Sequence, residues 1–298
     1  MWRMYNAGQE ESTKVTHSFF RMIFNTRFNI GFGSPKTDVC SKCLELKERL
    51  KAANITEREK QKLLTEYRVH KERSKAFFSL LKEKREDMLT LSFDCQKNFA
   101  LPKIPDQSVY YSRQFYLYNF TIVQGSSKDA LTKENVFIYT WGEHEYPKGS
   151  NEIASALFHR LKNTDFTGTT VLRCVADGCG GQNKNTTMMF MLQYWFAKHA
   201  PNNLKKIEAV FPIPGHSFIP PDRVFAQIEK KLKKIETLVE PSEFDNILSE
   251  SGTVFKPGRD YADHDWKKTS SAFLKPPAQW HFKFAPTLEI FRNEIIRC

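Results

Sequence analysis

Cysteine, long apolar runs and signal-like segments are all scarce in this sequence. Six cysteines in 298 residues are too few for a disulfide scaffold and favour a reducing compartment, the nucleus or the cytoplasm. The longest uncharged apolar stretch, Met188 to Ala197, is about half the ~20 residues that a membrane span needs. The first residues, MWRMYNAGQEEST, contain no apolar core of a secretory signal. We therefore expect an intracellular globular protein without a membrane segment.

The sequence signatures of several enzyme classes are also missing. The run GCGGQNKN at residues 178–185 is rich in glycine but lacks the GxxxxGK[ST] spacing of a phosphate-binding loop. No Ser/His/Asp or Cys/His arrangement has the pattern of a nucleophilic catalyst. Aromatic residues, in contrast, make up 13% of the chain and include 25 Phe, which argues against intrinsic disorder.

Basic residues are in excess. The chain has 45 Lys and Arg against 34 Asp and Glu, a formal net charge of +11. Residues 233–298 hold 10 of each sign, so the excess lies upstream of them. A polyanionic partner, DNA or RNA, is the favoured interpretation, and general solubility is the alternative.

Residues 1–87 have the patterns of an α-helical region. Apolar residues recur at helical spacing in residues 12–25, and a second helix is expected after Asp38. Thr56 and Glu59 form a capping-box pattern that begins a long helix, expected to reach Asp87. Its positions spaced by three and four residues form one face: Leu63, Tyr67, His70, Ser74, Phe77 and Leu81. The region is predicted to contain a long helical hairpin.

From Met88 onward the pattern changes to strands alternating with helices. Strands are expected at residues 88–94, 114–124, 135–141, 169–177 and 207–213, with helices at 150–163, 185–199 and 220–235. The order βββαβαβα predicts an α/β core with a mixed sheet over residues 88–232. Residues 233–298 have weak periodicity, and we expect an appended, irregular segment there.

Acidic residues stand at the ends of these expected elements. They are Asp94 and Asp177 at strand ends, Glu152 and Asp222 at helix starts, and Glu229 two turns after Asp222. An open α/β sheet places its site at such points. Two Mg²⁺ or Mn²⁺ ions would neutralise the four acids other than Glu229 and could clamp the oxygens of a phosphodiester. Taken singly, each acid could instead be a helix cap or a turn residue.

This arrangement resembles the ribonuclease H-like fold of ribonuclease H, retroviral integrases and DDE transposases. The resemblance implies that Asp94, Asp177 and Asp222 bind the metal ions, with Glu229 in reserve for Asp222. It places Glu152 where ribonuclease H has a helix glutamate, which DDE transposases generally lack. It also implies that His216 is a mobile loop histidine that assists product release.

A closer resemblance covers nearly the whole chain. Five segments look like a family of transposon-derived animal proteins, usually predicted to carry a ribonuclease H-like transposase core: FNTRFNIGFGSPKTDVCSKC, LSFDCQKNFALPKIP, VYYSRQFYLYNFTI, ADGCGGQNKN and GHSFIPPDRVFAQIE. Members often carry DNA-binding domains upstream, so this chain could be a truncated copy.

The resemblance implies a metal-dependent polynucleotidyl transferase or nuclease that acts on DNA. The alternative is a catalytically inactive remnant that binds nucleic acid or a protein partner. A third hypothesis is an interaction scaffold, such as a homo-oligomer, built on residues 56–87.

Cys40 and Cys43 form a CxxC pair that could begin a zinc site. Zinc needs two further ligands, and the sequence contains no second CxxC pair. His70 on the long helix is the best third ligand, with His17 or Cys95 as the fourth. The alternative is that His70 is a packed residue of the helix face.

A group of polar residues next to the expected site could contact nucleic acid. They are Gln182, Asn183, Lys184 and Asn185, together with Arg223 beside Asp222. The first four could contact phosphates or cap the helix that follows them.

Overall fold

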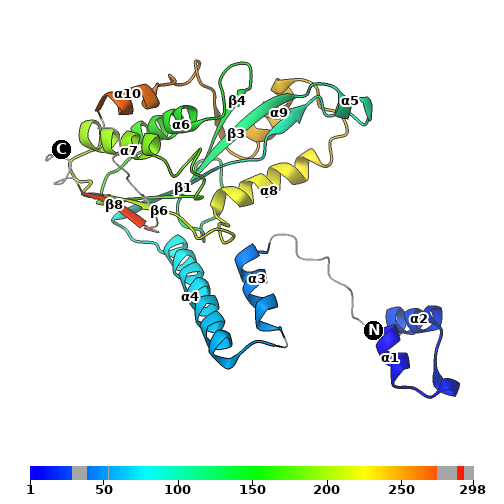
Figure 1. The fold of residues 1–298 in the computed structure, drawn as a ribbon. Helices are drawn as coiled ribbons and strands as arrows, with labels where there is room; N and C mark the ends of the chain where they lie inside the picture. Colours follow the sequence, from blue (N-terminus) through cyan, green and yellow to red (C-terminus); the bar gives the residue numbers. More distant parts are fainter. Residues whose placement is uncertain (29–38, 53, 274–286, 292–298) are drawn as a thin grey trace. The chain divides into compact units, whose positions relative to one another are not determined.

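A computed structural model describes residues 1–28, 39–52, 54–273 and 287–291, drawn as a ribbon in Figure 1. The chain divides into two compact units, Met1–Val39 and Cys40–Cys298. This division differs from the boundary expected at residue 87, because the helical hairpin belongs to the second unit. Within the described residues, no helix is long and apolar enough to cross a membrane.

The first unit is built from short helices: α1 (Trp2–Ala7), the 3-10 helix η1 (Glu11–Thr13) and α2 (His17–Arg27). The side chain of Thr16 caps α2 by accepting a hydrogen bond from the Phe19 N–H. The Trp2 indole N–H donates to the carbonyl of Val15 at 2.8 Å and so joins α1 to the segment that leads into α2. Residues 29–38, which include part of the first resembling segment, lie outside the described residues.

The hairpin consists of α3 (Ser41–Leu50) and α4 (Glu57–Lys82). The capping box of Thr56 and Glu59 is confirmed, but α4 ends at Lys82, because Glu83 is extended and the chain then turns into the first strand. Leu63, Ser74, Phe77 and Leu81 of the expected face are buried. This face packs on α3 and, through Phe77 and Leu81, on the sheet, so part of it is used inside the chain.

The sheet is mixed, as expected. Its strands are β1 (Met88–Cys95), β2 (Phe99–Leu101), β3 (Phe115–Gln124), β4 (Val136–Gly142), β5 (Val171–Ala176), β6 (Lys206–Val210), β7 (Thr253–Phe255) and β8 (Thr287–Phe291). The order is β7-β4-β3-β1-β5-β6-β8, and β2 pairs with β3. Strand β1 runs parallel to β5 and β5 parallel to β6, whereas β3 is antiparallel to both β1 and β4. The α/β class is thereby confirmed.

Helices cover both faces of the sheet (Figure 1). One face forms the first core with α6 (Ser150–Lys162) and α7 (Thr186–Lys198), and α10 (Trp266–Phe273) packs on these two helices. The other face forms the second core with α8 (Pro220–Leu232) and α9 (Pro241–Ser249). A short helix, α5 (Ser108–Tyr111), lies between β2 and β3. Along β1, Leu91 and Phe93 point into the first core. Because side chains alternate in a strand, Asp94 points to the face of α8.

The C-terminal segment is part of the fold, which corrects the expectation of an irregular appendage. Strand β7 adds to β4 at one edge of the sheet and β8 adds to β6 at the other. Phe244 of α9 and Trp266 of α10 are buried in the two cores. These elements are short, so each offers too few periodic positions to be recognised from sequence. Residues 274–286 and 292–298 lie outside the described residues.

Candidate functional site

The fold brings three of the expected acids to one end of the sheet. Phe93 of β1 is in parallel register with Ala176 of β5, so Asp94 and Asp177, the residues that follow, stand at neighbouring strand ends. Helix α8 packs against β1 and β3 and carries Asp222 in its first turn. The negative charges of Asp177 and Asp222 both raise the pKa of Asp94, which shows that the three carboxyl groups lie within electrostatic range.

Burial and like charge dominate the electrostatics of this cluster. Burial, followed by the Asp177 charge, raises the pKa of Asp94 to about 7, although the Cys95 N–H and Lys148 act in the opposite direction. The pKa of Asp222 is also raised, mainly by burial and further by Asp177. Such a cluster binds protons or cations because its charges repel one another in a partly dry environment.

Each aspartate is held through one oxygen. Oδ1 of Asp94 accepts from the Cys95 N–H at 2.7 Å, and Oδ2 of Asp222 accepts from the Ile219 N–H at 2.8 Å. Oδ1 of Asp177 accepts from the Asn183 Nδ2 at 2.6 Å and from the Cys179 N–H at 3.2 Å. Among the described residues, the second oxygen of each carboxyl group makes no hydrogen bond.

The cluster offers carboxylate oxygens, the ligand type that Mg²⁺ prefers. The buried Oδ1 of Asn183 beside it has no hydrogen-bond partner in the described part of the chain. The three carboxyl groups do not, however, converge to ligand spacing. Within the described residues, the group of ligand atoms lying within 4.8 Å of one another is Cys40, Cys43, His70 and His216. A Mg²⁺ site at these aspartates therefore stays a prediction.

The other two expected acids have different surroundings. Glu152 lies in the first turn of α6, a helix that packs in the core on the opposite face of the sheet from α8. Its pKa is raised mainly by burial and further by the charge of Asp263. Glu229 accepts a hydrogen bond from the Gln96 Nε2 at 3.0 Å. The roles proposed for Glu152 and Glu229 as metal ligands stay predictions.

A buried polar chain beside Asp94 escaped the sequence analysis. Oε1 of Gln96 accepts from Asn119 at 2.8 Å, and Oδ1 of Asn119 accepts from the Thr121 hydroxyl at 2.9 Å. Through Glu229 this chain ties α8 to β1 and β3. Gln96 follows Asp94 by two residues and could have been found by strand alternation, because positions i and i+2 share a face.

Lys148 is a second residue that sequence reasoning missed. Its Nζ donates to the Gln96 carbonyl at 3.0 Å and to Asn98 Oδ1 at 2.8 Å. Its positive charge lowers the pKa of Asp94. Lys148 lies in the loop between β4 and α6, where no spacing or motif singles it out.

Several residues expected to contact nucleic acid make contacts within the chain. Asn183 is fully buried beside Asp177, and Asn185 caps α7 by accepting from the Met188 N–H at 2.9 Å. The Nζ of Lys184 lies over the Phe211 ring, and Arg223 donates to the Asp129 carbonyl at 3.1 Å. Asn183 is therefore corrected from a phosphate contact to a support of Asp177. Gln182 is half-buried.

The Cys/His group joins three segments that are far apart in sequence. Sγ of Cys40 lies 3.3 Å from Nε2 of His70, and Sγ of Cys43 lies 3.4 Å from Nε2 of His216. The two Nε2 atoms are 3.1 Å apart. The group could therefore bind a metal ion such as zinc.

This geometry completes and corrects the zinc prediction. Cys40, Cys43 and His70 come together as expected, but His216 takes the fourth position. His17 packs its ring against Trp2 in the first unit, and Cys95 is a half-buried thiol beside Asp94. The structure thus places His216 with the cysteines rather than in the catalytic role that the resemblance implied. Sequence could not find it, because 173 residues separate it from Cys43.

Burial and nearby charged side chains shift the pKa values of this group. Burial lowers the pKa of both His70 and His216, and Lys71 lowers both further. Burial and the neighbouring Cys40 raise the pKa of the Cys43 thiol, whereas Lys71 and Lys47 lower it. Zinc binds cysteine as the thiolate, so an ion bound here would displace the thiol protons.

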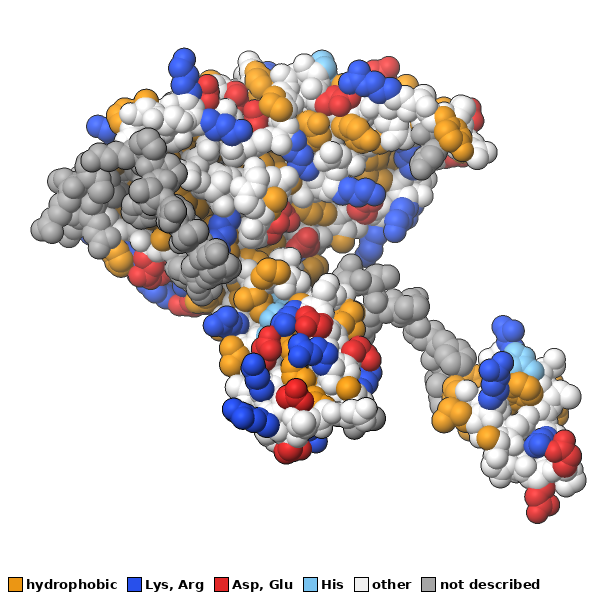
Figure 2. All heavy atoms as spheres, in the orientation of Figure 1, with side chains coloured by type: hydrophobic (Ala, Val, Ile, Leu, Met, Phe, Trp, Pro, Cys, Tyr) orange, Lys and Arg blue, Asp and Glu red, His pale blue; other side chains and the backbone are white. Residues whose placement is uncertain are grey.

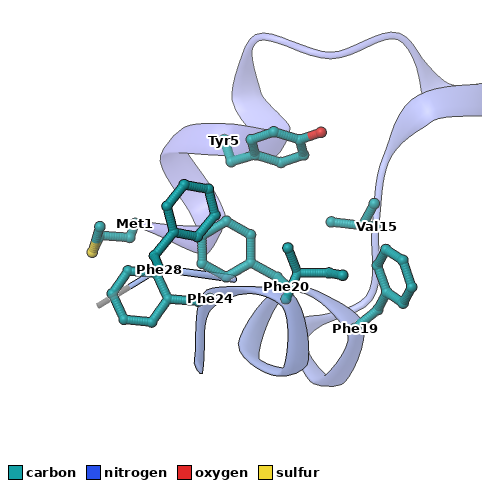
Figure 3. Close-up of a pocket in the computed structure, with 8 residues that line it drawn as sticks. Met1, Tyr5, Val15, Phe19, Phe20, Phe24 and Phe28 are labelled. Atoms are coloured by element: carbon teal, nitrogen blue, oxygen red, sulfur yellow. The ribbon is translucent and has the colours of Figure 1, made fainter. Parts of the chain in front are cut away.

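The first unit has an apolar cavity of about 380 Å³ (Figure 3). Its lining is Met1, Tyr5, Val15, Phe19, Phe20, Ile23, Phe24 and Phe28. The cavity is lined by none of the acidic or metal-ligating residues of the two clusters above. It could therefore bury an apolar group but has no catalytic or metal-binding side chain from those clusters.

The second unit is thus an α/β protein whose mixed sheet carries an aspartate cluster and a Cys/His group. A family model described as a domain of unknown function, DUF7869, matches residues 121–269, which is half of the chain, and the chain belongs to this family. No curated protein matches the chain. The matched range includes Asp177, Asp222 and His216 but not Asp94, Cys40 or Cys43.

Proposed function

We propose that the core is a metal-dependent nuclease or polynucleotidyl transferase of the ribonuclease H-like type, derived from a transposase and acting on DNA. The observation that carries this proposal is the gathering of Asp94, Asp177 and Asp222 from two neighbouring strand ends and a helix start. These acids are separated by up to 128 residues in the sequence, and the fold alone brings them together.

The strand order supports the proposal. Setting aside the short β2 and the one-turn α5, the elements from β1 to α8 follow the predicted order βββαβαβα. The two central parallel strands, β1 and β5, are those that carry Asp94 and Asp177. In a parallel pair the carboxyl ends meet at one edge, which is where an α/β sheet places its ligand.

Asp94, Asp177 and Asp222 would hold Mg²⁺ or Mn²⁺ through their free oxygens. When bound, such ions supply positive charge to the attacking and leaving oxygens of a phosphodiester. The Asn183 amide orients Asp177, and the N-terminus of α8 orients Asp222. Lys148 adds the positive charge of a side chain beside Asp94, where it could attract a phosphate.

The Cys/His group calls for a different metal in this proposal. Thiolates are soft ligands that suit Zn²⁺, whereas Mg²⁺ takes oxygen ligands. We therefore assign the hard cation to the aspartates and zinc to Cys40, Cys43, His70 and His216.

Nicking of a short DNA duplex in Mg²⁺ or Mn²⁺ tests the nuclease proposal. We expect wild type to nick, and Asp94→Asn and Asp177→Asn to lose at least about a hundredfold in rate, because each removes a charged ligand. The matched control is Asp165→Asn, since Asp165 is an acid that caps the turn at Thr167. Loss of activity in the control, or equal activity in all four proteins, would refute the assignment.

One observation favours the alternative of a nucleic-acid-binding protein without catalysis. The three aspartates do not reach ligand spacing, unlike the Cys/His group in the same described residues. In that case DNA would bind with strong salt dependence. Wild type and Asp94→Asn would bind DNA equally, and neither would cleave it.

A further inference from the structure

We propose that Cys40, Cys43, His70 and His216 hold one Zn²⁺ ion that fastens the α3–α4 hairpin to the segment leading into α8. The proposal depends on the geometry of the four side chains and on the segments that carry them. It does not depend on whether the aspartate cluster cleaves DNA.

Three distances between the four ligand atoms are close to the edges of a zinc tetrahedron, and all four atoms lie within 4.8 Å of one another. With Zn–S bonds of about 2.3 Å and Zn–N bonds of about 2.05 Å, tetrahedral angles give N···N edges of about 3.3 Å and S···N edges of about 3.6 Å. The structure has 3.1 Å between the two nitrogens and 3.3 and 3.4 Å for two sulfur–nitrogen edges. An ion therefore fits with shifts of a few tenths of an ångström.

The alternative is that the four residues form an ordinary packed cluster. Two buried cysteines and two histidines whose Nε2 atoms face each other have few other reasons to converge, because two neutral imidazoles can share at most one hydrogen bond. The same contacts would be satisfied at once by a cation at their centre.

The site is placed where α3 meets the core. Helix α4 is anchored near its C-terminus, where Phe77 and Leu81 pack on Val175 and Val210. There the buried Arg173 also donates to the carbonyl of Leu80 at 3.0 Å. Helix α3 lies further along the hairpin, and its first turn reaches the core through Cys40 and Cys43. Zinc would therefore cross-link the half of the hairpin that the apolar anchor does not hold.

The segment at residues 214–216 has a backbone conformation that allows it to lie close to Cys40. Gly215 has φ +81°, and a Cβ atom there would lie 2.8 Å from both Cβ and Sγ of Cys40. The Pro214 carbonyl lies 3.5 Å from the same sulfur. The turn at Pro214 and Gly215 thus lets His216 reach the cysteines across a very short gap.

The fastened segment continues directly to the aspartate cluster. Ile219, three residues after His216, is the N-cap of α8 and contributes to the apolar contact with α4. Its N–H donates to Asp222. Zinc at His216 would accordingly restrict the start of α8 as well as the hairpin.

The metal content of the purified full-length chain tests the site. We expect about one zinc per chain in wild type, and less than about one tenth of that in Cys43→Ser and His216→Ala. His17→Ala and Cys95→Ala are the matched controls, because they remove the two alternative fourth ligands suggested by sequence, and both should keep full zinc. Wild type without zinc after supplementation, or His216→Ala with wild-type zinc, would overturn the proposal.

A second measurement separates ligand loss from misfolding. Cys43→His replaces one zinc ligand with another and should retain zinc, whereas Cys43→Ser should not. Removing zinc from wild type with a chelator should increase amide hydrogen exchange in residues 40–50 and 211–219 at least several-fold, and zinc re-addition should reverse it. Unchanged exchange in both segments would refute the fastening role. Neither readout uses DNA cleavage, so the outcome is independent of the nuclease proposal.

Discussion

At the scale of single residues, Asp94 has the most perturbed chemistry of the aspartate cluster. Its pKa is raised to about 7, first by burial and then by Asp177. Sequence placed Asp94 and Asp177 at strand ends correctly, because apolar β-branched runs followed by Asp are a local signal. It could not show that Asn183 is buried beneath Asp177 or that Lys148 lies beside Asp94, because those contacts arise from chain segments that meet in space.

Asp94→Asn should stabilise the protein at high pH when no divalent metal is added. An unfolded Asp titrates near ~4, so the folded state binds the proton more tightly and stability falls as pH rises through about 7. Urea unfolding at about pH 5 and about pH 8 measures the effect. Between these two pH values, the free energy of unfolding of wild type should fall by roughly 1–3 kcal/mol more than that of the variant. Equal losses in both proteins would contradict the burial of an ionisable Asp94.

Gly215 offers a second prediction at this scale, with Gly168 as its control. Both have positive φ, +81° and +73°, but an added Cβ at Gly168 meets nothing within 4 Å. Gly168→Ala should therefore lower the free energy of unfolding by about 1 kcal/mol, because alanine adopts a positive φ less readily than glycine. Gly215→Ala should cost about 2–4 kcal/mol, because it also collides with Cys40. Chemical denaturation checks both, and equal costs would show that the contact with Cys40 is not close.

At the scale of elements, helices and strands with strong apolar periodicity could be predicted from the sequence, and those with weak periodicity could not. The long strands, α6, α7 and α8 follow repeated apolar positions, and Thr56 marks the start of α4. The elements between residues 238 and 291 are short and owe their place to tertiary contacts. Phe244 stacks on Phe99 of β2 with ring centroids 4.6 Å apart, a contact across 145 residues.

Helix α10 provides the prediction that tests this point. Trp266 is buried against Phe158 of α6, and its indole N–H donates to the Ser155 hydroxyl at 3.1 Å. Trp266→Ala should lose about 3–5 kcal/mol of unfolding free energy, since it empties a core position. Phe273→Ala in the same helix should lose less than about 1 kcal/mol, because Phe273 is 73% exposed. Similar losses in thermal unfolding would mean that α10 is not docked through Trp266.

At the scale of the whole molecule, the hairpin of α3 and α4 carries a large part of the net charge of +11: residues 40–82 hold 12 Lys and Arg against 6 Asp and Glu, a net charge of +6. Figure 2 shows Lys and Arg side chains interspersed with Asp and Glu over the visible face of α3 and α4. Several of these form ion pairs, either between the two helices, as Lys42 with Glu66 at 3.0 Å, or within one helix, as Lys75 with Glu72 at 2.8 Å. Paired charges on a helix surface contribute little to a long-range field. The polyanion prediction from charge therefore rests on the excess of basic over acidic side chains in the hairpin and in the rest of the chain.

Salt dependence of DNA binding by the full chain tests that prediction. Each phosphate that a basic side chain contacts releases bound counterions, so affinity should fall on the order of tenfold or more between about 50 and about 200 mM salt. Fluorescence anisotropy with a short labelled duplex, without divalent metal, gives the slope. Asp94→Asn should bind at least as tightly as wild type, because it removes a negative charge beside Lys148. Absence of binding at low salt would count against both the nuclease and the non-catalytic DNA-binding function, whereas binding with no cleavage in Mg²⁺ would favour the latter.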